Sequence, residues 1–495
     1  MSTVNIHFQR EFSPEIQRIR NHKEFNKYRL LLERMDEIIR VSGIDLEFAG
    51  RFIAFIEGKY SVRLSAKSRR KKIEYAVKGL RCNILRGYTR LSFEELSCRI
   101  AESPLLQWFI GASRIDGEIS VPCRSQLHKY SQMLTPEEIE IFVQKALDCL
   151  VSSGEVLGLE KNIDCGEIYV DACALEANIH FPVDWVLLRD AVRTLIKSIL
   201  TIRRHGLVHR MGTPEDFLSA INRECMSMSS ARKKKDAKKK RKRIFRRMKK
   251  IELTVREHGR RYFQLLKEKW METDLGGDEA EVILHRMGNV LEKIPEAVRQ
   301  AHKRIIRGEQ TDNARKILSL YDEHVNVIVR GKDKFEVEFG NSLFLAEQKC
   351  GFVVDWKLYQ DSAPGDTRKL EECLDRLADR KMDVTGIAGD RGFDSAATRK
   401  KLARHGSEIY NAICPKDRTE LARRQEEPRF RKMQKRRAQT EARISIVRNG
   451  FIGNPGTGRS FGQRRMDTAW AIFTHDLWVV ARMAQKEEQC LLKTG

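Results

Sequence analysis

The sequence predicts an α/β protein in which a mixed β-sheet is flanked by helices. Short runs rich in Val and Ile occur around residue 170 and again between residues 324 and 414, and Gly, Pro or Asp bounds them, as is typical of strands. Longer segments with apolar residues at helical spacing lie before, between and after these runs. The expected order of elements in the second half is strands, a helix, a strand, a helix, a strand and then helices. A mixed sheet with helices packed on it has this kind of order.

The length and charge of the chain limit what it can be. Its 495 residues exceed one ordinary hydrophobic core, so we expect two or three domains. The net charge of +24 favours a polyanionic partner, with nucleic acid first. A membrane surface is second, but the basic segments lack the Trp, Phe and Leu face of an interfacial helix; a generally basic soluble protein is the alternative. No apolar run approaches the roughly 20 residues that span a bilayer, and no signal-peptide core opens the chain. We therefore expect a cytoplasmic protein with no membrane partner.

The cysteines predict neither a zinc site nor a disulfide framework. There are 11 of them, an odd number, and none forms a CxxC pair. Reduced thiols in a cytosolic compartment are the simpler interpretation.

Residues 1–155 are expected to form a helical domain. Residues 28–39 place apolar side chains at helical spacing, and Ser92 with Glu95 predicts a capping box at the start of a further helix. Pro104 predicts a break, and residues 121–127 predict the entry to a short helix. Short capped helices with basic side chains suit a DNA reader of the helix-turn-helix kind, and they suit an ordinary helical bundle almost as well. We assign this domain to DNA binding or oligomerisation.

The first strand is expected at residues 166–180, and a long helical segment follows it. From residue 185 to 321 the chain is highly charged and nearly free of Pro and Gly for long stretches. Strand signals return only afterwards. We therefore expect residues 156–184 and 322–485 to form one split domain that holds the sheet, with residues 185–321 as a helical, highly basic insertion.

A block of like charge lies inside the insertion. Residues 232–250 carry 14 Lys and Arg and one Asp. Such blocks are often solvated or disordered, but the spacing of Ile244, Phe245 and Met248 allows a helix once the charge is neutralised. We interpret the block as a phosphate-binding arm, with a plain charged helix as the alternative. The residues assigned to DNA are Lys233, Lys234, Lys235, Lys238, Lys239, Lys240, Arg241, Lys242 and Arg243.

The rest of the split domain predicts the remaining strands and helices. Residues 324–358 alternate with a period of two between Gly breaks, which suggests a β-meander. The expected elements after it are a helix over 364–381, a strand ending at Asp390, a helix over 395–405, a short strand over 408–414, a basic helix over 426–448, a Gly-rich loop over 450–462 and an apolar helix after that.

Three acidic residues are candidates for a metal site. Asp171 lies inside an apolar strand, where a charge is costly unless it is paired, bound to metal or solvated. Asp390 follows a strand directly, and Glu441 lies on the basic helix. Carboxylate oxygens are the ligands that Mg²⁺ prefers, and two such ions can drive phosphodiester cleavage. Asp394 and Asp184 are the competing carboxylates.

Each candidate also has a structural explanation. A turn of the form Gly-Asp-Arg-Gly-Phe allows Asp390 to be an Asx turn only, and Glu441 can be one partner in surface ion pairs. If residues 426–448 form one helix, Gln434, Arg437, Glu441 and Arg448 share one face. A carboxylate between two guanidinium groups can hold metal while the cations bind phosphates.

These segments resemble the DDE transposases of bacterial insertion sequences, whose catalytic domain is RNase-H-like. The matching residues are 91–100, 108–111 and 121–125 of an InsH-type N-terminal region, the strand of Asp171, residues 336–340 and 363–366, the turn at 389–393 and the helix of Glu441. The resemblance is closest to the ISNCY-like branch. The family's third motif is Tyr-x2-Arg-x3-Glu-x6-Lys, and here Gln434 and Arg448 stand in place of its Tyr and Lys.

The resemblance implies a transposase with an RNase-H-like mixed sheet. It implies two Mg²⁺ ions, with Mn²⁺ as a substitute, at Asp171, Asp390 and Glu441. Water activated there would cut the transposon end, and the freed 3′-hydroxyl would attack target DNA. Arg391, Arg437 and Arg448 would bind phosphates.

The same resemblance implies the partners and the location. They are double-stranded DNA of the terminal inverted repeats and of the target, and a homodimer or higher oligomer on that DNA, in the bacterial cytoplasm at the nucleoid. Three alternatives remain open. They are a nuclease of the same fold without strand transfer, a catalytically inactive DNA-binding derivative, and an RNA-binding protein that uses the basic block.

Overall fold

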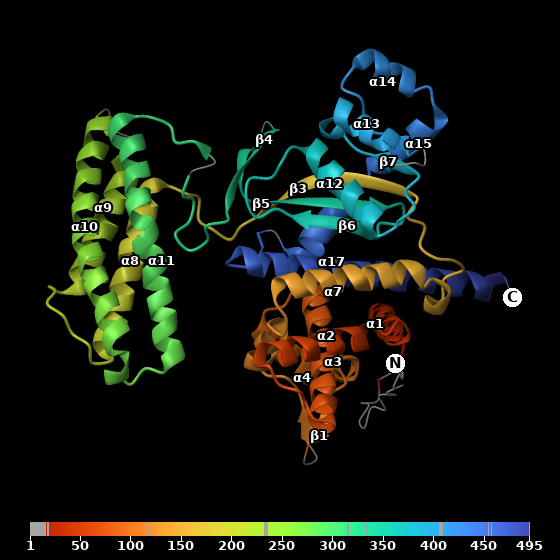
Figure 1. Ribbon diagram of the computed structural model, residues 1–495, viewed down its shortest axis with the longest axis horizontal. Helices are drawn as coiled ribbons and strands as arrows, with labels where there is room; N and C mark the ends of the chain where they lie inside the picture. Colours follow the sequence, from red (N-terminus) through yellow and green to blue (C-terminus); the bar gives the residue numbers. More distant parts are fainter. Residues whose placement is uncertain are drawn as a thin grey trace.

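A computed structural model describes residues 16, 19–115, 118–231, 236–313, 316–332, 335–404, 409–453, 455–456 and 458–494. The described chain is a mixed α/β protein whose mixed sheet is flanked by helices, as the sequence predicted. Figure 1 shows the sheet above a group of N-terminal helices, with a separate bundle of long helices beside them.

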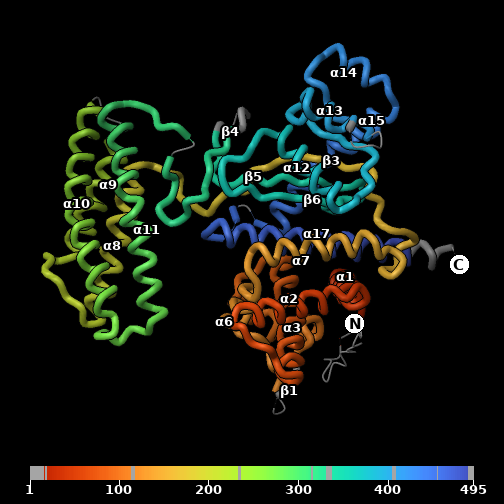
Figure 2. The backbone as a smooth tube through the Cα atoms, in the orientation of Figure 1, coloured from red at the N-terminus to blue at the C-terminus, as the bar shows by residue number. Residues whose placement is uncertain are grey.

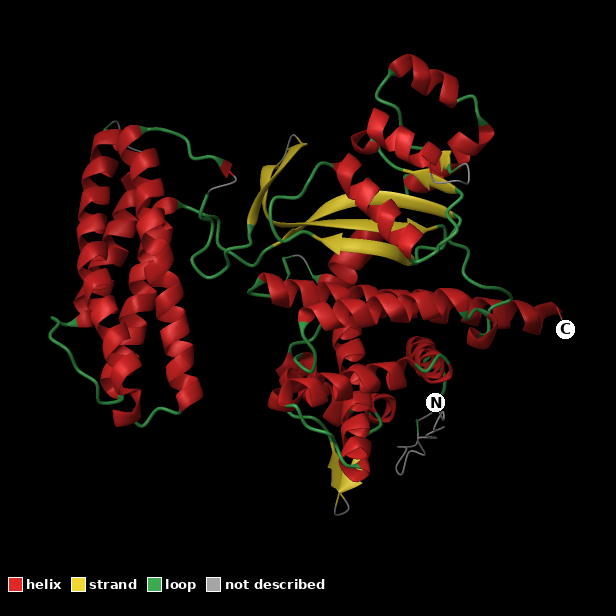
Figure 3. Ribbon diagram, in the orientation of Figure 1, coloured by secondary structure: helices red, strands yellow, loops and turns green. Residues whose placement is uncertain are grey.

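The central sheet contains six strands. They are β3 (Glu167–Glu176), β4 (Asn326–Lys332), β5 (Phe335–Gln348), β6 (Val353–Leu358), β7 (Gly386–Ala388) and β8 (Tyr410–Asn411). The order is β4-β5-β3-β7-β8, and β6 also pairs with β5. Strands β4, β6 and β3 run antiparallel to β5, whereas β7 and β8 add in parallel. The expected meander differs in one respect, because residues 335–348 form one continuous strand (Figure 3).

The parallel pairing of β3 with β7 determines how Asp171 and Asp390 are placed relative to each other. Each β3 residue pairs with the residue 219 positions further on: Glu167 with Gly386, Ile168 with Ile387 and Tyr169 with Ala388. Asp171 and Asp390 are separated by the same number of residues. Continuing the register past the last pair therefore brings the two aspartates level on neighbouring chains, which in a sheet lie about 4.8 Å apart.

Helices and turns connect the later strands. They are α12 (Asp366–Asp379), the 3₁₀ turn η6 (Arg391–Phe393), α13 (Ala396–Arg404), α14 (Arg418–Arg424), α15 (Pro428–Arg437), α16 (Thr440–Ser445) and the π-helical segment η7 (Ile446–Ile452). The prediction of one helix over residues 426–448 is wrong, because the chain turns at residues 438–439 between α15 and α16.

The N-terminal region is helical with one hairpin. Its elements are α1 (Lys23–Val41), α2 (Ile44–Tyr60), α3 (Ala66–Thr89), α4 (Phe93–Glu102), α5 (Pro104–Ile110), the strands β1 (Ser113–Ile115) and β2 (Glu118–Ser120), α6 (Arg124–Ser131), α7 (Pro136–Ser152) and the 3₁₀ turn η1 (Glu155–Leu157). The capping box of Ser92 and Glu95 is present. Pro104 begins α5, because its missing N–H costs nothing in a first turn.

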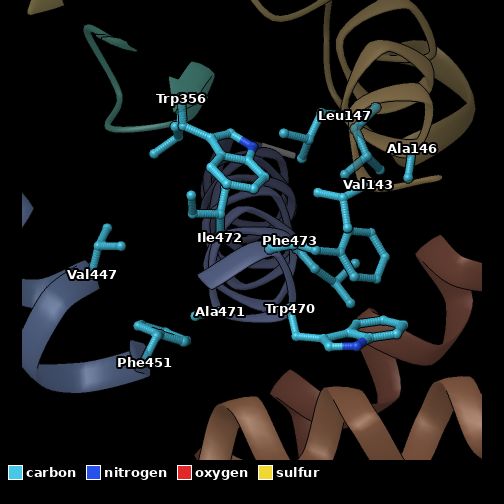
Figure 4. Close-up of a cluster of buried hydrophobic side chains, with 14 of the residues drawn as sticks. Val143, Ala146, Leu147, Trp356, Val447, Phe451, Trp470, Ala471, Ile472 and Phe473 are labelled. Atoms are coloured by element: carbon cyan, nitrogen blue, oxygen red, sulfur yellow. The ribbon is translucent and has the colours of Figure 1, made fainter. Parts of the chain in front are cut away.

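The C-terminal helix α17 (Phe461–Thr494) joins the N-terminal helices to the sheet. Figure 4 shows Phe473 of α17 near Val143 and Leu147 of α7, with Trp356 of β6 close to the same helix. The buried residues of α1–α7, the sheet and α17 form one continuous hydrophobic cluster.

The insertion has a core of its own. It consists of α8 (Asp184–Arg204), α9 (Pro214–Ser230), α10 (Ala237–Lys269), the 3₁₀ turn η3 (Trp270–Glu272), α11 (Gly277–His302) and the π-helical segment η4 (Lys303–Arg307). Its four long helices lie side by side (Figure 2), and their buried residues form a second cluster. Within the described residues, none of the helices combines the length and apolar composition needed to cross a bilayer.

Candidate active site

Asp171 lies midway along β3, in the strand that the sequence predicted for it. The backbone N–H of Ala172 donates to its Oδ1 at 2.7 Å. Burial raises the pKa of Asp171 to about 6; the hydrogen bond from Ala172 and the charge of Arg437 oppose the rise, and the charges of Asp390 and Glu441 add to it. The three predicted acids are therefore close enough for the other two to repel the Asp171 carboxylate.

Asp390 lies just past the end of β7, and it does form the Asx turn considered above. The backbone N–H of Gly392 donates to its Oδ1 at 2.8 Å, which makes Asp390 the N-cap of η6. The second carboxylate oxygen takes no hydrogen bond from the described residues. The turn and the site are thus compatible, because the turn fixes one oxygen and leaves the other available.

A fourth carboxylate approaches this turn. A Cβ added to Gly392 would lie 2.8 Å from Oδ2 of Asp366 and 3.0 Å from Oδ1 of Asp390. These two distances place the two oxygens no more than 5.8 Å apart. Lys369 donates to the other oxygen of Asp366 at 2.9 Å. Asp366 was noticed in the sequence only as part of a familial segment, because no local pattern relates the start of α12 to the end of β7.

Glu441 reaches the site on α16, which packs on β3. Its side chain is exposed. The interruption after Arg437 is slight, because Ala438 and Gln439 keep right-handed helical dihedrals. Arg437 and Glu441 still lie near Asp171, whose pKa both influence.

Two side chains of α15 fix this helix against the strand ends. The amide of Gln434 donates to the carbonyl of Gly389 at 3.1 Å and to that of Ala412, and its oxygen accepts from Nε of Arg437 at 3.2 Å. Gln434 therefore orients Arg437 next to the two aspartates. Gln434, which stands where the resembled motif has a tyrosine, therefore has a positioning role that needs no aromatic ring.

Arg436 is the second anchor, and the sequence analysis missed it. It pairs with the buried Glu347 of β5 at 3.0 Å and lies over the ring of Tyr169 at 4.6 Å. It also donates to the carbonyl oxygens of Gln348 and Lys349. Glu347 was the available signal, since a charged residue at an inward position of a strand requires a partner.

Arg448 lies apart from α15 and α16. It lies in η7, where the helical spacing changes, and its Nε is buried without a hydrogen-bond partner among the described residues. Arg391 is exposed directly after Asp390. Of the three arginines predicted to bind phosphates, Arg437 and Arg391 therefore adjoin the acids, and Arg448 lies further along the chain.

The competing carboxylates have structural partners. Asp394 forms a two-pronged ion pair with Arg399, with distances of 2.9 and 2.8 Å. Asp184 accepts from Gln300 at 2.9 Å and pairs with Arg304 at 3.0 Å inside the insertion. Neither is a better candidate than Asp171, Asp390 and Glu441.

Part of the basic block lies outside the described residues, and the rest lies on α10. Lys233, Lys234 and Lys235 lie outside the described residues. Lys238, Lys239, Lys240, Arg241, Lys242 and Arg243 lie on the first turns of α10, whose Ile244, Phe245 and Met248 are buried in the bundle. Arg241 stacks on Trp185 at 5.1 Å, while Lys238, Lys239 and Arg243 are exposed. In the described part, the block is one face of a packed helix.

The donors at the site suit a hard cation, although they are not yet spaced as a cage. Two aspartates and a glutamate offer oxygen ligands of the kind that Mg²⁺ binds. Burial is the main cause of the raised pKa of Asp171, and a cation would offset the repulsion from Asp390 and Glu441 that adds to it. In the described ranges, no three Asp, Glu, His or Cys side chains lie close enough together to hold an ion.

Comparisons with protein-family models, with curated proteins and with solved structures found no match.

Proposed function

We propose that this protein is a DDE transposase that binds transposon ends, cuts DNA there and transfers the freed strand into target DNA. The observation that carries the proposal is that Asp171, Asp390 and Glu441 converge: the register of β3 against β7 brings the two aspartates level, and the helix of Glu441 packs on β3. The charges of Asp390 and Glu441 accordingly add to the rise in the pKa of Asp171. These residues come from three distant parts of the chain. A structural fold has no need to gather like charges around a half-buried carboxylate, whereas a site for divalent cations does.

The sheet supports an RNase-H-like assignment for this domain. Strands β6, β5 and β3 are antiparallel neighbours, and β7 and β8 continue the sheet in parallel on the other side of β3. Asp171 then belongs to the central strand, and Asp390 follows the strand next to it, at the edge where α/β sites usually lie.

The proposed chemistry assigns a role to each nearby side chain. Asp171, Asp390 and Glu441 would hold two Mg²⁺ or Mn²⁺ ions, which supply charge stabilisation and an activated oxygen for phosphodiester cleavage. Arg437, which Gln434 orients, would bind a phosphate beside Asp171. Arg391 would bind the next phosphate along the strand.

The proposed partner is duplex DNA. The net charge of +24 and the exposed lysines on α10 favour sequence-independent binding to phosphates. The N-terminal helices are proposed to read the terminal repeats and to support a dimer or higher oligomer on DNA. The proposed location is the bacterial cytoplasm, at the nucleoid.

A cleavage and strand-transfer assay tests the proposal. The substrate is the DNA that flanks the coding region, with Mg²⁺ and a supercoiled target plasmid. We expect nicked ends and joined products from the native protein. Asp171→Asn, Asp390→Asn and Glu441→Gln should each lower cleavage at least about a hundredfold, the scale for losing an essential charge-stabilising group, with duplex affinity retained. Glu426→Gln is the matched control, because it removes an exposed acid near α15.

The alternatives give other results. Cleavage without joined products indicates a nuclease, and binding without cleavage by the native protein indicates a DNA-binding derivative. Preferential displacement of the DNA by RNA indicates an RNA-binding protein.

A further inference from the structure

A pocket opens beside Asp390 and shares only Arg391 and Gln434 with the site described so far. Its volume is about 360 Å³, within the range of roughly 300–1,000 Å³ for small-ligand sites. It is lined by Arg391, Cys414, Leu421, Gln425, Phe430, Arg431 and Gln434. Arg391 is the residue after Asp390, and Gln434 is bonded to the carbonyl of Gly389. The pocket therefore begins within one residue of the proposed metal site.

The pocket combines an apolar floor with a cationic rim. Leu421 supplies the accessible apolar surface, and Phe430 lies beneath it, almost completely buried. The guanidinium groups of Arg391 and Arg431 are exposed, and neither has a hydrogen-bond or ion-pair partner among the described residues. Arg424 covers the Phe430 ring at 5.1 Å, so this residue is held in place.

This combination matches the two parts of a nucleotide. A base is a flat apolar surface with polar edges, and stacking on apolar or aromatic side chains is how proteins hold a base outside the duplex. Arginine is suited to bidentate phosphate binding. The exposed side-chain amide of Gln425, which has no partner in the described part of the chain, can bond to a base edge.

We propose that this pocket binds one unpaired nucleotide of the DNA strand, next to the phosphate that is cut. The base lies over Leu421, which the buried Phe430 supports from beneath, and Arg391 and Arg431 bind its phosphate. The identity of the strand rests on the proposed function; the binding of a nucleotide rests on the pocket alone.

Cys414 provides a direct test in the native chain, because it is a free thiol that lines the pocket. Alkylation of individual cysteines by N-ethylmaleimide is followed by peptide mass spectrometry, with and without dAMP. We expect dAMP at about ten times its Kd to slow alkylation of Cys414 roughly tenfold, because mass action leaves about a tenth of the sites free. Cys98 and Cys123, which are exposed and belong to the N-terminal region, should react at unchanged rates.

Variants and partial ligands test the chemistry of the pocket. Arg431→Ala should weaken the protection by dAMP about tenfold, the scale for losing one charge-assisted contact. Lys432→Ala removes the neighbouring exposed charge, which does not line the pocket, and should change nothing. Adenosine and deoxyribose 5-phosphate should each protect less than dAMP. A DNA end with one unpaired nucleotide should protect more than a blunt duplex.

Several results would overturn the inference. One is equal alkylation of Cys414 with and without dAMP and DNA, and another is unchanged protection in Arg431→Ala. A third is protection by deoxyribose 5-phosphate equal to that by dAMP, which would indicate a plain phosphate site. Asp171→Asn separates the two proposals, since it should abolish cleavage and leave the protection by dAMP intact. Protection without cleavage by the native protein would refute the transposase and retain the pocket.

Discussion

At the residue scale, Asp171 holds a carboxylate where its charge costs free energy. Burial and two like charges raise its pKa to about 6, above the usual 3.8. The folded state therefore binds the proton more tightly than the unfolded state does. The resulting penalty on stability is absent below about pH 4 and fully present above pH 6. A residue that weakens the fold at neutral pH is typical of a functional site.

This penalty gives a prediction without any assay of activity. Asp171→Asn cannot ionise, and its amide oxygen can still accept from Ala172. Without divalent ions, the variant should be more stable than the native protein above pH 6, by on the order of 1–3 kcal/mol, and equally stable near pH 4. Denaturant unfolding at both pH values measures this. Mg²⁺ should reduce the difference, because it stabilises only the native carboxylate, and a difference that does not change with pH would contradict the prediction.

Gly392 is the second residue of note, because its position leaves no space for a side chain. A methyl group there would lie 2.8 Å from the Asp366 carboxylate and 3.0 Å from that of Asp390, so one of the two must move. We expect Gly392→Ala to reduce DNA cleavage by about tenfold or more, as small displacements at an active site do, with a small change in thermal midpoint. In Gly450→Ala the new methyl group meets its nearest neighbour at 3.9 Å, and this control should retain activity.

At the element scale, α15 is held in position by buried polar contacts. Glu347 is buried, and burial raises its pKa while Arg436 opposes the rise. Losing one partner of such a pair leaves an uncompensated charge, which costs about 3–5 kcal/mol. The helix that carries Arg437 thus depends on one guanidinium that has no direct part in the chemistry.

A double-variant cycle tests this anchor. Arg436→Met should lower the free energy of unfolding by about 3 kcal/mol. Adding Glu347→Gln should recover much of the loss, since the remaining charge is removed. Lys432→Met, at an exposed position of the same helix, should have little effect. If the single and double variants lose equal stability, the contribution of Arg436 is packing and not charge.

The first turns of α10 have an unusual charge for a helix. Beyond the N-cap Asp236 they contain no acidic residue, although the positive end of the helix dipole favours acids there. A basic N-terminus is tolerable on the surface and becomes favourable when phosphate binds. This element therefore suits DNA better than it suits an isolated bundle.

Salt dependence of DNA binding measures the role of α10. Replacing Lys238, Lys239 and Arg243 with Gln should reduce the log–log salt slope by up to about 2.7, at about 0.9 per phosphate contact on duplex DNA. The control replaces Arg261, Lys267 and Lys269 with Gln near the other end of the same helix. Equal changes in both variants would indicate that the net charge matters and the position does not.

At the scale of the whole molecule, the insertion is a separate helical unit whose sequence lies between β3 and β4. Glu176 at the end of β3 and Asn326 at the start of β4 pair with the same residue, Gly340 of β5, from opposite sides. The strand ends that flank the insertion therefore lie about two strand spacings apart, roughly 10 Å. Its apolar side chains form their own core.

Removing the insertion should leave the remainder folded. We expect a chain in which a short Gly-Ser linker replaces residues 182–316 to unfold cooperatively and to keep its mixed α/β circular dichroism, with less helix. Leu318 and Asp322 are retained, because Leu318 packs on Ala177 and Asp322 pairs with the buried Arg464. DNA binding should weaken and become less dependent on salt. Loss of cooperative unfolding would mean that the bundle supports the sheet.

The sequence by itself determined the kind of each main element, because periodicity, capping and turn residues act over a few positions. It also singled out the three acids as candidates and predicted the turn around Asp390. It did not reveal the break between α15 and α16, the continuous strand β5, the anchors Gln434 and Arg436 or the approach of Asp366. Those features depend on contacts between segments far apart in the chain, above all the register of β3 against β7. Only the folded structure decides that register, because the packing of whole strands and helices determines which residues of neighbouring strands are paired.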